Sequence, residues 1–362
     1  MNPSTILKFN NSNRQFYSEL KKRVDNYFKE NNISKTGNFN MYAKTAFMFL
    51  AYFVPFILLC TGVFESKLVW FLLACLMGFA MAGIGLCVMH DANHGSYSKN
   101  NTINKIFSFT INMLGGHSIN WKVQHNVIHH TFTNVHNHDE DIAPPGFMRF
   151  EPHAERKWIH KLQFVYAWFF YGLMTLMWST TKDFKQINRY SKKGFLKGFN
   201  TTFKKEIATI VISKILYFAY MLIPLFLIKE MTFLNWLTGF VVINYIAGFV
   251  LAAIFQPAHV AQETEFPIPS ESGNLENDWA IHQMKTTMNF ATRDKVFSWL
   301  VGGLNHQVEH HLFPNICHVH YDQISKIVKK TADEFNVPYL SKKTFAGALW
   351  SHEKLLWKLG RA

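Results

Sequence analysis

Residues 68–94 read LVWFLLACLMGFAMAGIGLCVMHDANH, an uninterrupted apolar run followed at once by His90 and His94. An α-helix needs about 20 apolar residues to cross the hydrocarbon core of a bilayer. If this helix continues past Met89, His90 and His94 lie on one face, because residues four apart in sequence are neighbours on a helix. The stretch therefore predicts a membrane-spanning helix that carries two potential metal ligands at its end.

Three more apolar runs of similar length lie at residues 42–64, 207–228 and 232–255. Only residues 65–67 connect the first run to the run at 68–89, and only residues 229–231 connect the last two. Connections this short predict antiparallel helical hairpins. Lys214 lies inside the third span, where its long side chain is expected to reach the lipid headgroups. The sequence thus predicts an all-α membrane protein with four transmembrane helices in two hairpins.

A fifth apolar stretch, residues 162–181, decides the predicted topology. The Lys-rich N-terminus has no signal-peptide core and is expected in the cytosol, to which each hairpin then returns the chain. A fifth crossing would separate the last histidine cluster from the other two. Because both flanks of this stretch are basic, we expect an interfacial helix, with all three clusters in a cytosolic helical cap.

The composition favours a bilayer as the partner of this chain. The formal charge of its 362 residues is +13, and 49% of them are hydrophobic. In a multi-pass protein, basic cytosolic segments facing anionic lipid explain that charge, so we expect no nucleic acid as a partner. The four cysteines form no CxxC pair, which disfavours a cysteine-ligated cluster. The predicted division is a cytosolic arm (1–40), a membrane domain (41–316) and a cytosolic tail (317–362).

Histidines are concentrated in three clusters: HDANH at 90–94, HNVIHH at 125–130 and HQVEHH at 306–311. His259, just past the fourth span, is a further candidate. Neutral imidazole is a usual ligand of first-row transition metals, and so many rings exceed what one zinc ion needs. The clusters therefore predict a dinuclear centre. Its candidate metal ligands are His90, His94, His125, His129, His130, His259, His306, His310 and His311.

A nitrogen-rich dinuclear centre beside apolar spans points to two iron ions that activate O2 against an unactivated C–H bond of a lipid chain. One alternative is a di-iron lipid or alkane hydroxylase. A third interpretation is a histidine-rich metal transporter. Transporters place polar ligands near mid-depth in the membrane, whereas these clusters fall at or beyond helix ends, which disfavours transport.

The three clusters resemble the histidine boxes of the integral-membrane fatty acid desaturases, in the forms HDANHGS, HNVIHH and NHQVEHHLFP. The third box is similar to that of the front-end subgroup, and the resemblance, strongest to bacterial acyl-CoA or linoleoyl-CoA desaturases, runs from about Met81 to Pro314. It implies a cis double bond introduced into a fatty acyl chain, using O2 and two electrons at a di-iron centre (Fe2+/Fe3+). The implied catalytic residues are the box histidines His90, His94, His125, His129, His130, His310 and His311.

The third box leaves one ligand open. The resemblance aligns Gln307 with the position three residues before the His310–His311 pair. His306 stands four residues before His310, and both spacings place a side chain on the same helix face. Three acids inside or beside the boxes, Asp91, Asp141 and Glu309, are candidates to hydrogen-bond the outer nitrogens of metal-bound rings.

The His-Pro-Gly-Gly haem motif of a fused cytochrome b5 domain is absent from the sequence. We therefore expect electrons from a separate donor, a ferredoxin or a cytochrome b5-like protein with its reductase. The expected substrate is a fatty acyl-CoA or an acyl-lipid. The expected location is a membrane, specifically the bacterial inner membrane, with the active site on the cytosolic side.

Overall fold

The computed structural model describes residues 7–10 and 14–362, and the chain divides into two compact units. Unit 1 holds the described residues of 1–38 together with 124–167 and 254–362. Unit 2 holds residues 39–123 and 168–253. Helices dominate both units, as the sequence predicts.

Unit 2 is built from helical segments alone in the residues described. Its longer helices are α2 (Phe39–Thr61), α3 (Lys67–Gly83), α5 (Asn101–Ser108), α11 (Asp183–Lys192), α12 (Phe203–Met221) and α14 (Phe233–His259), whose last residues belong to unit 1. Its shorter segments are η1 (Ile84–Met89), α4 (His90–Asn93), α6 (Thr110–Met113), α7 (Ser118–Trp121), α10 (Met174–Met177), η4 (Trp178–Lys182), η5 (Phe195–Phe199) and α13 (Ile223–Leu227).

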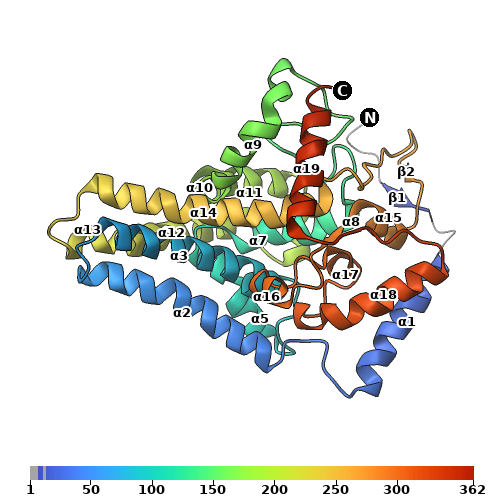
Figure 1. Ribbon diagram of the computed structural model, residues 1–362, viewed down its shortest axis with the longest axis horizontal. Helices are drawn as coiled ribbons and strands as arrows, with labels where there is room; N and C mark the ends of the chain where they lie inside the picture. The colour runs from blue at the N-terminus through green and yellow to red at the C-terminus, as the bar shows by residue number, and fades with distance from the viewer. Residues whose placement is uncertain (1–6, 11–13) are drawn as a thin grey trace. The chain divides into compact units, whose positions relative to one another are not determined.

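Four helical stretches are long and apolar enough to cross a membrane: Phe39–Thr61, Lys67–Asn93, Phe203–Leu227 and Phe233–His259. Each contains most of one predicted span, so the expected number is confirmed. α2 packs along α3, as Figure 1 shows. The second stretch continues through the π-helical turn η1 into α4, so the helix does run past Met89.

The apolar stretch at 162–181 is divided among several short segments. They are η3 (Trp158–Leu162), α9 (Gln163–Gly172), α10 and η4. None of these is among the four stretches able to cross a membrane.

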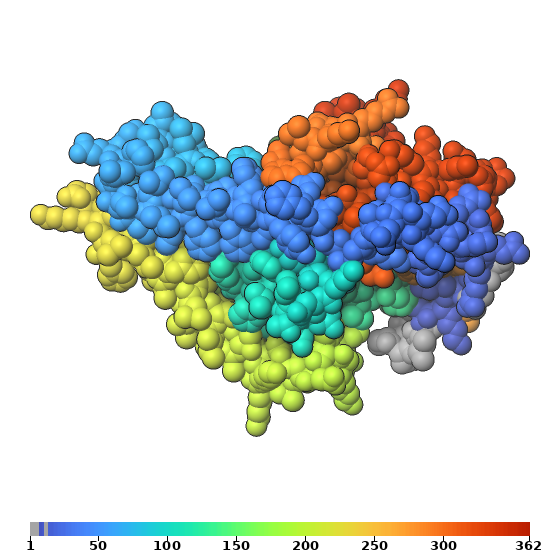
Figure 2. All heavy atoms as spheres, turned by 90° about the horizontal axis from the view of Figure 1, so that it is seen from below, coloured from blue at the N-terminus to red at the C-terminus, as the bar shows by residue number. Residues whose placement is uncertain are grey.

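The expectation for Lys214 is wrong. Its side chain is 7% exposed, and its ammonium group donates to the Asp183 carboxylate at 2.9 Å and to the Gly115 carbonyl at 3.0 Å. Asp183 begins α11, which packs on α12, so the helix partner supplies an opposite charge that the sequence of the span does not reveal. A buried cation is stable only when paired in this way. In Figure 2 the teal segment of α5 and α6 lies beside the yellow-green segment that contains α11 and α12.

Unit 1 combines short helices with two small parallel sheets. Its helical segments are α1 (Arg14–Glu30), η2 (Lys122–His129, from unit 2 into unit 1), α8 (His130–Phe132), α15 (Trp279–Thr286), α16 (Lys295–Leu300), α17 (Gln307–Leu312), η6 (His318–His320), α18 (Tyr321–Glu334) and α19 (Phe345–Leu359). Strand β1 (Lys8–Phe9) pairs with β2 (Asn274–Leu275), and β3 (Asn289–Phe290) pairs with β4 (Ser341–Lys342).

The core of unit 1 brings the N-terminal helix α1 together with helices from the C-terminal part of the chain. Helix α1 buries Phe16, Leu20, Val24 and Phe28, one residue per turn, against α18 and α15. That i, i+4 spacing is the apolar stripe of an amphipathic helix. In Figure 2 the blue surface of α1 lies against the red surface of the C-terminal helices. The N-terminal arm and the C-terminal residues are therefore structural parts of unit 1.

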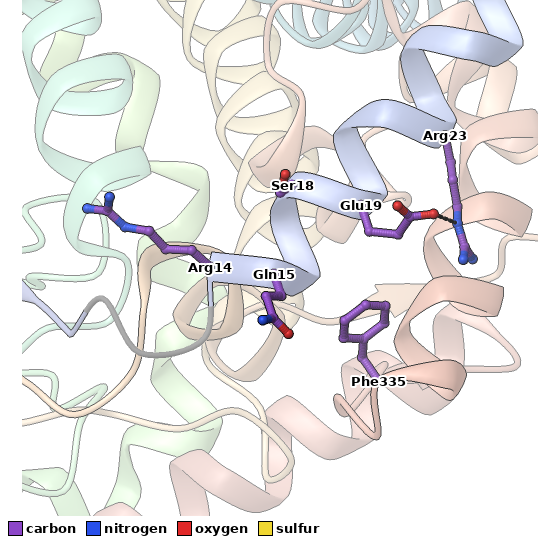
Figure 3. A pocket seen from close by; sticks show the side chains of 6 residues that line it. All are labelled: Arg14, Gln15, Ser18, Glu19, Arg23 and Phe335. Atoms are coloured by element: carbon purple, nitrogen blue, oxygen red, sulfur yellow. Dashed lines mark hydrogen bonds and ion pairs between the residues drawn. The ribbon is translucent and has the colours of Figure 1, made fainter.

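A shallow hollow lies beside α1, as Figure 3 shows. It is lined by Arg14, Gln15, Ser18, Glu19, Arg23 and Phe335. Glu19 and Arg23, one turn apart on α1, form an ion pair along its wall at 2.8 Å. None of the candidate metal ligands lines this hollow.

Candidate metal centre

Six of the predicted ligands lie together inside unit 1. They come from the end of η2 (His125, His129), the start of α8 (His130), the end of α14 (His259) and the helix α17 (His310, His311). The ligand atoms of His129, His259 and His311 lie within 4.8 Å of one another, and so do those of His130, His310 and His311. All these rings are buried. Ligand atoms gathered this closely could surround a metal ion, and the two neighbouring triads share His311.

The second box owes part of its geometry to a π-helical turn. His125 lies in η2, which is a π-helix, and its Nε2 is 3.2 Å from Nε2 of His130. Residues five apart do not face each other on an α-helix, but the wider π-turn, with its i to i+5 hydrogen bonds, brings them together. Such turns occur often at functional sites. All three histidines of the box therefore point into one region.

An outer partner holds the Nδ1 atom of each of five rings. His125 Nδ1 is 2.8 Å from Asp141 and His129 Nδ1 is 2.8 Å from Asp139. The remaining partners are the Tyr321 hydroxyl for His310 (3.1 Å), Oε1 of Gln283 for His311 (2.8 Å) and the Thr286 carbonyl for His259 (3.4 Å). Metal-ligating histidines almost always have such a partner, which fixes the ring and leaves the other nitrogen for the metal.

The inner nitrogens of two rings match that expectation directly. Nε2 of His129 and Nε2 of His259 are buried and have no hydrogen-bond partner among the described residues. A buried polar atom without a partner is costly, which is why such atoms are rare unless an ion or water fills the place. Burial disfavours the charged form of His129, but the Asp139 carboxylate outweighs it and raises the pKa of the ring. The donor set is therefore suited to a cation.

The three box acids behave differently. Asp141 hydrogen-bonds a box histidine, as predicted. Asp91 has its carboxylate 3.5 Å from Nδ1 of the adjacent His90. Glu309 instead accepts hydrogen bonds from Asn289 at 2.8 Å and Tyr339 at 2.9 Å. Burial raises the pKa of Glu309 to about 7, against the effect of these two donors.

Glu309 and its partners hold helix α17 from behind. The side-chain carbonyl of Asn289, in β3, accepts from the Val308 backbone at 2.8 Å. Tyr339 lies just before β4, the strand that pairs with β3. The third box is thus fixed by a C-terminal segment, which is why the sequence alone does not connect Tyr339 with the site.

Replacing Tyr339 by phenylalanine is expected to destabilise the protein by about 1–3 kcal/mol, because the buried Glu309 loses a hydrogen-bond donor. Thermal unfolding of the purified protein measures this as a lower Tm. Tyr27→Phe, at a half-buried tyrosine of α1, is the matched control and should leave Tm unchanged. Equal Tm values for both variants would show that the hydrogen bond to Glu309 contributes no stability.

His306 and Gln307 are both buried at the start of the third box. His306 belongs to none of the ligand groups found among the described residues, and its Nδ1 is 3.8 Å from the Glu309 carboxylate. Burial lowers the pKa of His306 to about 4, so the ring is neutral. Oε1 of Gln307 is buried and has no hydrogen-bond partner in the part of the chain described. Nδ1 of His306 is likewise buried without a hydrogen-bond partner in that part of the chain, so both residues keep an atom that could bind metal.

The first box lies in unit 2. The rings of His90 and His94 have centroids 4.8 Å apart, as expected for one helix face. Both rings contact the edge of Trp121, with centroid distances of 5.5 and 5.7 Å. The assignment of these two rings as metal ligands stays a prediction.

Several residues around the site were missed by reasoning from the boxes. Asp139 and Gln283 stand in segments that resemble the family, but no role follows from their spacing. His282, beside Gln283, is fully buried and hydrogen-bonds the Thr133 carbonyl at 2.8 Å, so it orders the second box rather than binding metal. Burial lowers the pKa of His282 to about 4. Tyr321 lies beyond the resemblance and carries no sequence signal.

Comparison with known proteins defines the class to which this fold and histidine site belong. The family model described as fatty acid desaturase matches residues 65–343. The chain therefore belongs to the fatty acid desaturase family and is an oxidoreductase that desaturates fatty acyl chains.

Its individual relatives are similar along nearly the whole chain. The sn-1 linoleoyl-lipid 6-desaturase of Synechocystis sp. is 37% identical and is aligned over 96% of both chains. The acyl-lipid (8-3)-desaturase of Physcomitrium patens is 36% identical, over 96% of this chain and 72% of that protein. The sn-1 linoleoyl-lipid 6-desaturase of Arthrospira platensis is 35% identical, over 95% of this chain and 92% of that protein.

Proposed function

We propose that this desaturase works at a di-iron centre and is a front-end enzyme for lipid-linked acyl chains. The observation that carries the proposal is the pair of buried histidine triads that share His311. Zinc would need only one such set of ligands, whereas a second triad provides for a second ion. The absence of cysteine from these two triads favours iron chemistry over a thiolate site.

The contacts within unit 1 support a proposed role for each residue. One iron would be held by His129, His259 and His311. The second iron would be held by His130, His310 and His125. Because one nitrogen binds one ion, His311 serves only one of the two. Asp139, Gln283 and Tyr321 keep the outer nitrogens occupied, so that Nε2 of each ring is presented to metal.

Two irons bound here would supply the chemistry of O2 activation with two electrons, enough to take two hydrogens from adjacent methylene groups and release water. The chain contributes the rest. It excludes water by burying the rings, and it holds the ligands in fixed orientation through the outer hydrogen bonds. His90, His94 and Gln307 are proposed as further ligands on the strength of the family resemblance, and His306 is the weaker candidate.

The proposed substrate and position of desaturation rest on the third box and the relatives. Gln307 in NHQVEHHLFP is the front-end pattern, and the relatives are named 6-desaturases and an (8-3)-desaturase acting on lipids. These names favour a lipid-linked acyl chain over acyl-CoA. They also favour desaturation over the hydroxylase alternative. The electrons would come from a ferredoxin or a cytochrome b5-like protein that docks on the basic cytosolic face.

The proposed topology has two transmembrane hairpins, with the histidines on the cytosolic side. Glu65 and Lys229 lie between the paired spans and are exposed. We expect a cysteine placed at either position to react with an impermeant maleimide added outside intact cells. A cysteine at Gln323, exposed in α18, should react only after the cells are opened. Labelling of position 65 or 229 only in opened cells would refute this topology.

A fatty-acid profile tests the function. A host expressing the chain with a compatible electron donor and fed linoleate should accumulate a more unsaturated acid, whose new double bond lies between the carboxyl end and the existing ones. A hydroxylated product would instead support the alternative function, that of a di-iron lipid hydroxylase. A new bond on the methyl side would contradict the front-end proposal while leaving the desaturase itself intact.

A further inference from the structure

The C-terminal helix α19 carries an exposed stripe of tryptophan and basic residues. Its buried face includes Ala348, His352 and Leu356. The opposite face exposes Trp350, Lys354, Trp357 and Lys358 in i, i+3 and i+4 steps. The two indole side chains are 59% and 50% exposed, which is far more than a packed tryptophan shows. This surface is therefore built for contact with something other than the core of unit 1.

The cations on this stripe sit over the rings rather than away from them. Lys354 Nζ is 5.4 Å from the ring centroid of Trp350. The Arg361 guanidinium is 4.3 Å from the ring of Trp357 and 5.2 Å from that of Phe164. The aromatic rings and the cations are thus in contact with each other on this surface. Such a combination is typical of segments that lie at a membrane–water interface.

A second exposed segment of unit 1 adjoins the end of α19. Gln163 donates a hydrogen bond to the Leu356 carbonyl at 2.8 Å, so η3 and the start of α9 are fixed to α19. In Figure 1 the red α19 lies beside the green segment that contains η3 and the start of α9. The exposed residues of this segment repeat the pattern of the stripe: Lys157, Trp158, Lys161, Leu162 and Val165. Trp158 is 85% exposed.

The surface formed by α19, η3 and the start of α9 carries an excess of positive charge, which indicates an anionic partner. Residues 155–165 and 345–361 contain six Lys and Arg but only two acids, Glu155 and Glu353. Exposed aromatic and aliphatic side chains rimmed by Lys and Arg are the signature of a segment that lies on a bilayer with its apolar side among the headgroups. We propose that α19, together with η3 and the start of α9, binds a membrane surface by contacting the anionic phospholipid headgroups of that membrane.

This attachment is distinct from the four candidate spans. It assigns the C-terminal helix, which the sequence predicts to be part of a cytosolic tail, to the lipid surface. Because α19 is part of unit 1, the contact would hold the unit that carries the histidine triads against the membrane from which the acyl chain comes. It requires neither iron nor turnover, so its test is independent of the desaturase assignment.

The test uses the full chain in vesicles, with Cys60 and Cys75 replaced by alanine and a nitroxide attached at Ala346→Cys, on the exposed stripe. The matched control carries the nitroxide at Gln323→Cys, exposed on α18. Accessibility to a water-soluble nickel complex is compared with accessibility to O2, which partitions into the bilayer. In phosphatidylcholine vesicles containing phosphatidylglycerol, position 346 should be at least about threefold less accessible to nickel than position 323.

A second comparison tests whether binding depends on charge. The variant Lys354→Gln, Lys358→Gln, Arg361→Gln, or vesicles without phosphatidylglycerol, should raise the nickel accessibility of position 346 toward that of position 323. These residues are on the surface, so the variant should remain folded. Equal accessibility of the two positions in the unaltered chain would overturn the proposal. The proposal would also be overturned if position 346 were equally protected with and without phosphatidylglycerol and in the charge variant. Dipolar broadening between labels would overturn it too, because it would show that a second copy of the chain covers this face.

Discussion

His311→Ala is expected to abolish desaturation to below the limit of detection and to lower the iron bound by the purified protein. His311 is the ring that belongs to both buried triads, so its loss removes a ligand from whichever ion it serves and opens a cavity between the two. Its ring centroid is 4.3 Å from that of His130, 4.7 Å from that of His259 and 4.9 Å from that of His129. Product analysis and metal determination on the same preparation measure the two effects.

The control for this variant is His153→Ala. His153 is exposed, and its ring hydrogen-bonds the Phe266 carbonyl rather than facing the triads. That variant should keep its iron and its activity. Both proteins should insert in membranes in similar amounts, since the spans are untouched. Normal turnover by His311→Ala would show that the shared ring is not a ligand, and the assignment of two triads would then fail.

Asp139→Asn is expected to weaken iron binding by roughly 10- to 100-fold, the usual effect of removing the outer partner of a metal-bound histidine. Asp139 accepts from Nδ1 of His129 and also from the Asn134 backbone at 2.9 Å. The amide keeps the shape but loses the charge that raises the pKa of His129 and strengthens the ring as a donor. Iron retained during stepwise treatment with a chelator measures the affinity.

Glu140→Gln, at the adjacent acid, is the matched control for Asp139→Asn and should retain iron as the unaltered protein does. Added iron should restore activity to Asp139→Asn, because the variant keeps all its ligands. This rescue distinguishes a positioning residue from a ligand. Loss that no excess of iron repairs, or no loss at all, would contradict the role assigned to Asp139.

Local rules govern how the rings of one box lie relative to one another, so the sequence predicts that part of the geometry. The i, i+4 spacing within each box places rings on one helix face, and the ring pair of His90 and His94 confirms this. The composition of the triads is not local. One triad takes His129, His259 and His311 from three segments far apart in the chain. Only tertiary packing decides such a combination.

The failures have the same physical origin. Lys214 looked like a residue that reaches the headgroups, because its own span offers no acid, yet Asp183 of another helix pairs with it. Tyr321 and Tyr339 come from the C-terminal segment and reach the third box through the core around α18 and the pairing of β3 with β4. The π-turn that aligns His125 with His130 is likewise absent from simple α-helical periodicity.

Metal determination combined with Mössbauer spectroscopy of the purified, iron-reconstituted chain tests the central claim most directly. The account predicts two irons per chain, with the spectrum of two nitrogen-rich high-spin sites. It also predicts loss of that signal in His311→Ala but not in His153→Ala. A folded protein that binds no iron, or that holds a single zinc ion in its place, would contradict the claim that the buried histidine triads form a di-iron centre.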